Sequence, residues 1–116
     1  MPRDIVLTTT VKPNLTDLVR VAADTDPGLR VREIAHGAVT QFVDDDGNVV
    51  LSISIDSAVL VAVPGESARL IGAAAPEPVW WIEAWTSFGP AGERGIRLAR
   101  EFAQQCRAAC RVTAMR

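Results

Sequence analysis

The sequence contains no tyrosine and only one histidine, His36, among its 116 residues. A single imidazole excludes a metal site built from several histidines and any mechanism that needs two of them. A serine or cysteine nucleophile would have to lie near His36, and the chain has no G-x-S-x-G motif. We therefore expect a non-enzymatic protein with no catalytic residue and no cofactor.

Cysteine is equally scarce, since Cys106 and Cys110 are the only two. They stand four positions apart in a stretch with helical periodicity, which would place both thiols on one helix face. Successive helical turns give poor geometry for a disulfide. The spacing predicts two reduced thiols that pack as small apolar side chains.

Long apolar runs are also missing. A transmembrane helix needs about 20 consecutive apolar residues, and no segment reaches that length. The first residues lead directly into a strand-like segment without a signal-peptide core, which predicts a cytoplasmic protein without a membrane partner. Hydrophobic residues make up 48% and charged residues 22% of the chain. This composition and length are typical of one globular domain, here residues 1–116.

Charge is distributed unevenly along the chain. Residues 1–83 carry a net charge of −6, whereas residues 84–116 carry +4. The arginines of the C-terminal segment would line one face of a helix, where they either attract an acidic protein partner or the acidic body of the chain itself. Nucleic-acid binding is not predicted, because the chain is acidic overall, with a pI of about 5.3, and no aromatic residue lies among these arginines.

Local patterns predict two helices and a series of strands. A β-branched run predicts a strand at 5–11, and Asn14 is a good N-cap for the helix that follows. Alternating or apolar segments predict further strands at 29–44, 49–55, 58–63 and 79–88, with a short one at 68–71. The last helix follows residues 89–92, and Arg111–Met115 either ends it or forms a terminal strand.

Two turns interrupt these strands. His36 and Gly37 break the pattern of 29–44 as a bulge or a turn, and Asp45–Asn48 has the composition of a hairpin loop. The aspartates at 44–46 resemble part of a calcium loop. However, no glutamate stands at the distal position that such a loop requires, so we predict no metal site.

The order of elements, β-α-β-β-β-β-α, predicts an α+β fold. Short connections favour an antiparallel sheet of about five or six strands, with both helices packed on one face. The clean alternation of 49–55 predicts a half-exposed strand, whereas the wholly apolar 58–63 predicts a central strand covered on both faces. The second face of the sheet would then be open to solvent or to a partner.

All three tryptophans lie in one segment, PVWWIEAWTSF (78–88). Strand alternation places Trp80 and Phe88 on one side, with only uncharged neighbours, and this side should face the core. The other side holds Trp81, Glu83 and Trp85. Because glutamate is rarely buried without a partner, this side should be the open face, and we predict these three residues to bind a partner.

A structural role for the same residues is the competing interpretation. Arg30 or Arg32, from a neighbouring strand, would cover the two outward indoles and pair with Glu83. In that case the face would need no partner.

The aromatic strand continues into an amphipathic arginine helix, GERGIRLAREFA (92–103). This arrangement resembles small actinobacterial immunity-type proteins encoded near secreted toxins. The resemblance covers roughly the last third of the chain and transfers no binding residues. It implies a protein that neutralises a toxin by binding it.

We therefore expect a protein-binding domain whose partner is a protein, such as a toxin, or a second copy of the chain. A small-ligand-binding or sensing domain, with a pocket between sheet and helices, is the alternative. A cavity lined by Trp80 or Phe88 would favour the alternative. A flat exposed face at Trp81 and Trp85 would favour the interface.

Overall fold

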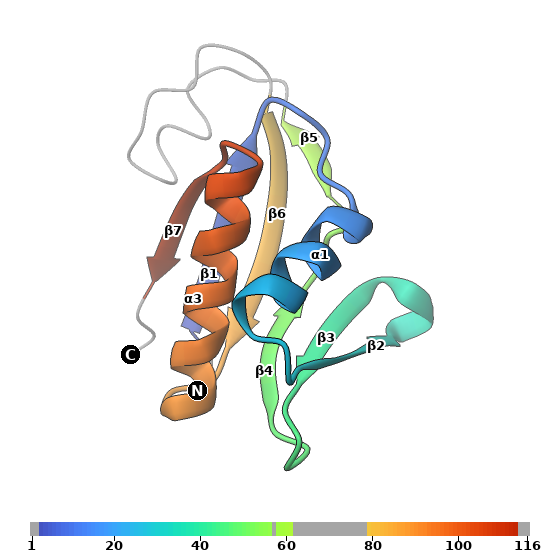
Figure 1. Ribbon diagram of the computed structural model, residues 1–116. Helices are drawn as coiled ribbons and strands as arrows, with labels where there is room; N and C mark the ends of the chain where they lie inside the picture. Colours follow the sequence, from blue (N-terminus) through green and yellow to red (C-terminus); the bar gives the residue numbers. More distant parts are fainter. Residues whose placement is uncertain (1–2, 57, 62–78, 114–116) are drawn as a thin grey trace.

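The computed structural model describes residues 3–56, 58–61 and 79–113. Two helices, α1 (Leu15–Thr25) and α3 (Pro90–Gln105), lie on one face of an antiparallel sheet (Figure 1). The sheet has seven strands, β1 (Arg3–Thr9), β2 (Arg30–Ile34), β3 (Val39–Val43), β4 (Val49–Ile53), β5 (Val59–Val61), β6 (Val79–Thr86) and β7 (Ala109–Thr113). The predicted α+β class is confirmed, with slightly more strands than expected. The short strand predicted at 68–71 lies outside the described residues.

The strand order is β2-β3-β4-β6-β1-β7, and β5 also pairs with β6. Strand β6 therefore has β1 along one side and both β4 and β5 along the other. Strand β4 meets it at Ala84 and Trp85, whereas β5 meets it at Val79–Trp81. Between these two pairings the amide of Ser54 donates to the Glu83 carbonyl at 2.9 Å. Strand β6 is thus a central strand of the sheet.

The additional strand is β7, which decides between helix and strand for residues 111–113. Residues 109–113 pair with β1, so Arg111 lies in a strand and not on the helix. The chain leaves α3 at Arg107, whose φ of +54° is left-handed. The helical spacing of the two cysteines therefore misled the prediction, because Cys106 caps α3 and Cys110 belongs to β7.

Both cysteines are nevertheless unbonded, as predicted. Each is half-buried and packs against the hydrophobic core. Burial raises the pKa of the Cys106 and Cys110 thiols above the ordinary value. Because the thiolate is the reactive form, both groups are poorly nucleophilic at neutral pH.

The predicted exposures of two strands are wrong. Strand β4 was expected to be half-exposed, but Val50 and Ser52 are buried like Leu51 and Ile53. The small Ser52 side chain lies between Gln41, which donates to it, and its paired residue Trp85. Strand β5 was expected to be central, yet Val59 and Leu60 are 60% and 49% exposed. Among the described strands β5 pairs with β6 alone, so it lies at an edge.

The predicted turns and helix cap are confirmed. Residues Ala35–Gly37 form a turn between β2 and β3, and His36 there is exposed with φ +57°. Residues 44–48 form the hairpin between β3 and β4, where Asp44 Oδ1 accepts from two backbone amides. The Asn14 side chain accepts from the Asp17 amide at 2.8 Å and caps α1.

The hydrophobic core fills the space between the sheet and the two helices. Phe102 and Ile96 of α3 are buried in it. The other contributors from β1, β3, β4, β6 and the helices include Ile5, Leu7, Leu18, Phe42, Leu51, Ile53, Ile82, Ala84, Leu98 and Ala99. Neither described helix is both long and apolar enough to cross a membrane.

Glycine lets α3 approach the sheet closely. A Cβ on Gly92 would collide with the Ser87 carbonyl, and a Cβ on Gly95 would collide with the Val50 carbonyl oxygen. The Thr86 hydroxyl, which donates to Val50 O at 2.6 Å, lies in the same contact. The glycines of the GERG segment therefore set the distance between the helix and the sheet.

Candidate functional site

The two sides of β6 differ as strand alternation predicts. Ile82 and Ala84 point toward the helices and are buried in the core. Trp81, Glu83 and Trp85 therefore point to the opposite face, which neither described helix covers. Figure 1 shows both helices on the same side of β6.

The neighbouring residues on this face follow from the strand register. In β1, Thr8 lies opposite Trp81, Val6 opposite Glu83 and Asp4 opposite Trp85. We call these six residues the tryptophan face: Asp4, Val6, Thr8, Trp81, Glu83 and Trp85. Its centre is strand β6, which is paired on both sides, so the backbone that carries the indoles is held firmly.

Exposure on this face is graded. The side chain of Glu83 is exposed, whereas Trp81 and Trp85 are half-buried, as Trp80 is on the other side of the strand. The Glu83 carboxylate makes no hydrogen bond or ion pair with another residue of 3–56, 58–61 or 79–113. Trp85 follows Trp81 by four positions, so their backbones lie about 13 Å apart along the strand, and each lies about 7 Å from Glu83.

Arg30 and Arg32 do not cover the two indoles, so the competing interpretation is wrong for these two arginines. Their strand, β2, is separated from β6 by β3 and β4. Arg32 Nε donates to Gln41 Oε1 at 2.9 Å, and Arg30 Nη2 donates to the Asp44 carbonyl at 3.4 Å. Both guanidinium groups are engaged far from Glu83.

The predictions for Trp80 and Phe88 are also wrong. Trp80 was expected to be buried, but it is half-buried, with Lys12 Nζ 5.2 Å from its ring centroid. Phe88 is 48% exposed because β6 ends at Thr86, so strand alternation no longer decides its direction. Arg3 Cζ lies 5.0 Å from the Phe88 ring centroid.

A row of polar side chains leads across the sheet to Trp85. Gln41, which accepts from Arg32, donates through Nε2 to Ser52 Oγ at 3.1 Å. Ser52 is the β4 residue paired with Trp85. This row could not be predicted from the sequence. The polar side chains of 29–44 and 49–55 can be placed beside one another only when the strand register is known.

A hollow of about 870 Å³ opens beside Trp85. Its walls come from the β3–β4 hairpin, the end of β6 and the start of α3. We call it the Trp85 hollow; its lining is Gln41, Asp44, Asp46, Asn48, Val49, Ser52, Trp85, Thr86, Ser87, Phe88, Pro90, Ala91 and Arg94. Phe88 lines it, which is the feature expected of a ligand-binding domain, and Trp85 of the tryptophan face lines it as well.

An ion cluster closes the inner side of this hollow. Arg94 holds Asp26 through two hydrogen bonds of 2.8 Å, and its Nη1 lies 3.6 Å from Asp44 Oδ2. The hydrogen bonds from Arg94 lower the pKa of Asp26, and those from the Asn48 amide and side chain lower the pKa of Asp44. The hydrogen bonds between Arg94 and Asp26 also raise the pKa of Arg94. The cluster ties the start of α3 to the end of α1 and to the β3–β4 hairpin.

We expect Arg94→Ala to lower the free energy of unfolding by about 1.5–3 kcal/mol, because it removes charged hydrogen bonds to the half-buried Asp26. Urea denaturation at pH 7 measures this loss. Arg20→Ala is the matched control, since the Arg20–Asp17 pair is exposed and should contribute less than about 0.5 kcal/mol. Equal losses in the two variants would contradict a structural role for the cluster.

The same cluster makes stability depend on pH. Both aspartates have a pKa below the ordinary 3.8, so they release protons more readily when folded than when unfolded. Their contribution is fully present above pH 3.8 and is lost as the pH falls through the lowered values. Arg94→Ala should therefore remove part of the acid-induced loss of stability.

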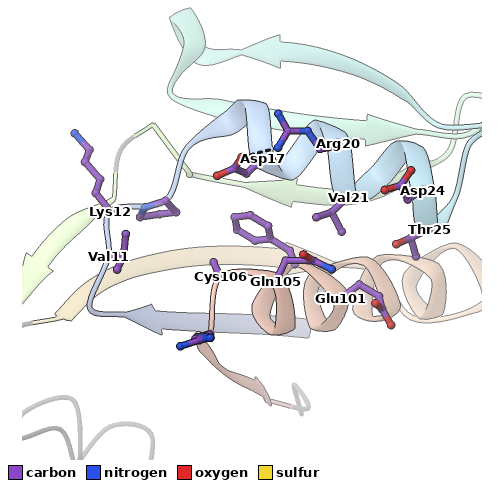
Figure 2. A pocket seen from close by; sticks show the side chains of 13 residues that line it. Val11, Lys12, Asp17, Arg20, Val21, Asp24, Thr25, Glu101, Gln105 and Cys106 are labelled. Carbon is purple, nitrogen blue, oxygen red and sulfur yellow. Dashed lines mark hydrogen bonds and ion pairs between the residues drawn. The ribbon is translucent and has the colours of Figure 1, made fainter.

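A second concavity, a groove of about 750 Å³, lies between α1 and α3 (Figure 2). Val21, Phe102 and Cys106 give it an apolar floor, and Asp24 and Glu101 face it from the two helices. Neither Trp80 nor Phe88 lines it. Part of its wall is held by the ion pair of Arg20 with Asp17 at 3.2 Å.

No group of three or more potential metal ligands from histidine, cysteine, aspartate and glutamate is found among the described residues. Comparison of the chain with protein-family models, with curated proteins and with solved structures found no match. The function is therefore inferred from the chemistry of the surfaces described above.

Proposed function

We propose that this protein is a non-enzymatic protein-binding domain whose interface is the tryptophan face. The observation that carries the proposal is the pair of half-buried indoles, Trp81 and Trp85, on either side of the exposed Glu83, which has no side-chain partner among the described residues. Leaving apolar rings in water is unfavourable, and contiguous exposed apolar surface commonly marks a binding site. Tryptophan is also among the residues that contribute most to protein interfaces.

The Trp85 hollow supports the same proposal. Residues that dominate an interface usually lie beside pockets from which water is fully displaced on binding. Here Trp85 forms a wall of the hollow together with Phe88, whose ring is 48% exposed. A partner that covers the tryptophan face can therefore insert a side chain beside Trp85.

We propose that the partner is a protein of the secreted-toxin kind, so that the domain acts as an immunity protein. The resemblance of the aromatic strand and arginine helix to immunity-type proteins supports this choice. Self-association through the same face is the second outcome that a binding experiment must distinguish. Nucleic acid is not proposed as a partner, since the chain carries a net charge of −2.

We expect Trp81→Ala and Trp85→Ala each to weaken partner binding by about 2 kcal/mol or more, roughly 30-fold, while barely changing stability. The Trp80→Ala variant is the matched control, because it removes the same side chain from the other side of β6. Calorimetric titration with the product of an adjacent toxin gene measures the affinity, and sedimentation of the protein alone measures self-association. Unchanged affinity and unchanged self-association in both variants would refute the proposal.

A small-ligand-binding or sensing domain is the second candidate function. The groove between α1 and α3 favours it, because an apolar floor with charged walls is a common form of ligand site. This groove lies on the helical side of the sheet, opposite the tryptophan face. Substitutions at Trp81 and Trp85 would leave a ligand in the groove unaffected, which separates the two candidates.

A further inference from the structure

The chain supplies cations to two of its own aromatic rings, the half-buried Trp80 and the exposed Phe88. Lys12 lies over Trp80 at 5.2 Å and Arg3 lies over Phe88 at 5.0 Å, measured to the ring centroids. These distances are typical of cation–π contacts. Trp81 and Trp85, also half-buried, have no such cation among the described residues. The tryptophan face therefore carries two indoles whose ring faces remain available to a positive charge.

The carboxylates near these indoles are equally available. Asp4 is the cross-strand neighbour of Trp85, and Glu83 is two residues away on the same side of β6. Within the part of the chain that the structure describes, neither carboxylate makes an ion pair. Asp4 and Glu83 thus place two negative charges beside Trp85. Indole is the aromatic ring that attracts cations most strongly.

The arginines around the Trp85 hollow are already engaged. Arg94 pairs with Asp26 and Asp44, and Arg3 pairs with Glu93 at 3.0 Å. Three further arginines lie on this side of the sheet. Arg32 is bound to Gln41 and Arg30 to the Asp44 carbonyl, both three strands from β6. Arg111 on β7 lies opposite Val6, the residue that pairs with Glu83, and is itself engaged. Among the described residues, the charge without an ion-pair partner beside Trp85 is therefore negative.

We propose that the partner presents an arginine or lysine side chain to Trp85, with its cationic head over the indole and within reach of Asp4 and Glu83. The aliphatic stem of such a side chain packs against Trp85 and Phe88 in the hollow, while the head stays near the carboxylates. This inference rests on the proposed function and adds the chemistry of the group that is recognised. It predicts a basic partner surface.

The three indole N–H groups of the protein provide a direct test by ¹H–¹⁵N NMR. The probes are a capped diarginine peptide and a capped diglutamine peptide of the same length, titrated at physiological salt. We expect diarginine to shift the Trp85 indole signal in a saturable way, with a smaller shift at Trp81. We expect diglutamine to shift neither. Equal shifts by both peptides, or a larger response at Trp80, would overturn the inference.

Asp4→Asn combined with Glu83→Gln isolates the contribution of charge, since it keeps the size of both side chains. We expect the double variant to bind diarginine roughly three- to tenfold more weakly, as is typical for loss of partly exposed charge pairs and cation contacts. Asp56→Asn, an exposed aspartate between β4 and β5, is the control and should leave the affinity unchanged. Unchanged affinity in the double variant would overturn the inference.

The same variants separate this inference from the proposed function. If Trp85→Ala weakens binding of the protein partner while Asp4→Asn with Glu83→Gln does not, the tryptophan face is an interface without a cationic anchor. In that case the proposed function stands and the inference about its partner fails. If neither set changes partner binding, the proposed function itself fails.

Discussion

The Phe102→Ala variant is expected to lose about 3–5 kcal/mol of stability, a large part of the total for a domain of this size. Phe102 is fully buried and lies where α3 packs on the core, below the groove between α1 and α3. Truncation removes the transfer energy of the ring and leaves a cavity that rigid strands on one side cannot close. Thermal and urea denaturation measure the loss.

Phe88→Ala is the matched control for this variant. It removes the same ring from a position that is 48% exposed, so the expected loss is less than about 1 kcal/mol. A Phe102→Ala protein with an unchanged thermal midpoint would show that this face of α3 is not closed against the core.

Gly95→Ala is expected to destabilise the protein by about 3 kcal/mol or more, although the same change in an ordinary helix is stabilising by about 1 kcal/mol. The added methyl group would collide with the Val50 carbonyl oxygen and come within 2.8 Å of Thr86 Oγ1. Neither oxygen atom can move away easily, because Val50 belongs to a strand paired on both sides. Relief requires that α3 move away from the sheet.

Gly28→Ala tests the same substitution where nothing lies within 4 Å of the new methyl group. It should leave the free energy of unfolding nearly unchanged. Stabilisation by Gly95→Ala would mean that α3 lies farther from β4 than the structure places it. Circular dichroism at increasing urea concentration distinguishes the two variants.

Much of the fold could be predicted because its long elements carry strong local signals. The helix after Asn14 has a cap and regular apolar spacing, and the strand around Trp81 alternates over its whole length. Strand β7 was not predicted with certainty, because its cysteine continues the helical spacing of α3. The backbone reverses direction at Arg107, so the residues after it form a strand and do not continue α3. No glycine in the sequence marks this reversal.

Within the candidate site, the residues of one strand were predicted and their neighbours were not. Alternation alone separates Trp81, Glu83 and Trp85 from the core side of β6. Placing Asp4 and Ser52 beside them requires the strand order, which depends on how the whole sheet packs. Phe88 was misplaced because the strand stops at Thr86, and the alternation rule applies only within a strand.

The pairing of β1 with β6 and β7 has a consequence for the order of folding. Strand β1 is made first, yet its two neighbours in the sheet are β6 and β7, the last strands along the chain. Contacts between segments so distant in sequence slow folding, because a long loop must close before they form. During synthesis the tryptophan face cannot assemble until β6 has left the ribosome. Until then Ile5 and Leu7 of β1 remain exposed to chaperones and to other nascent chains.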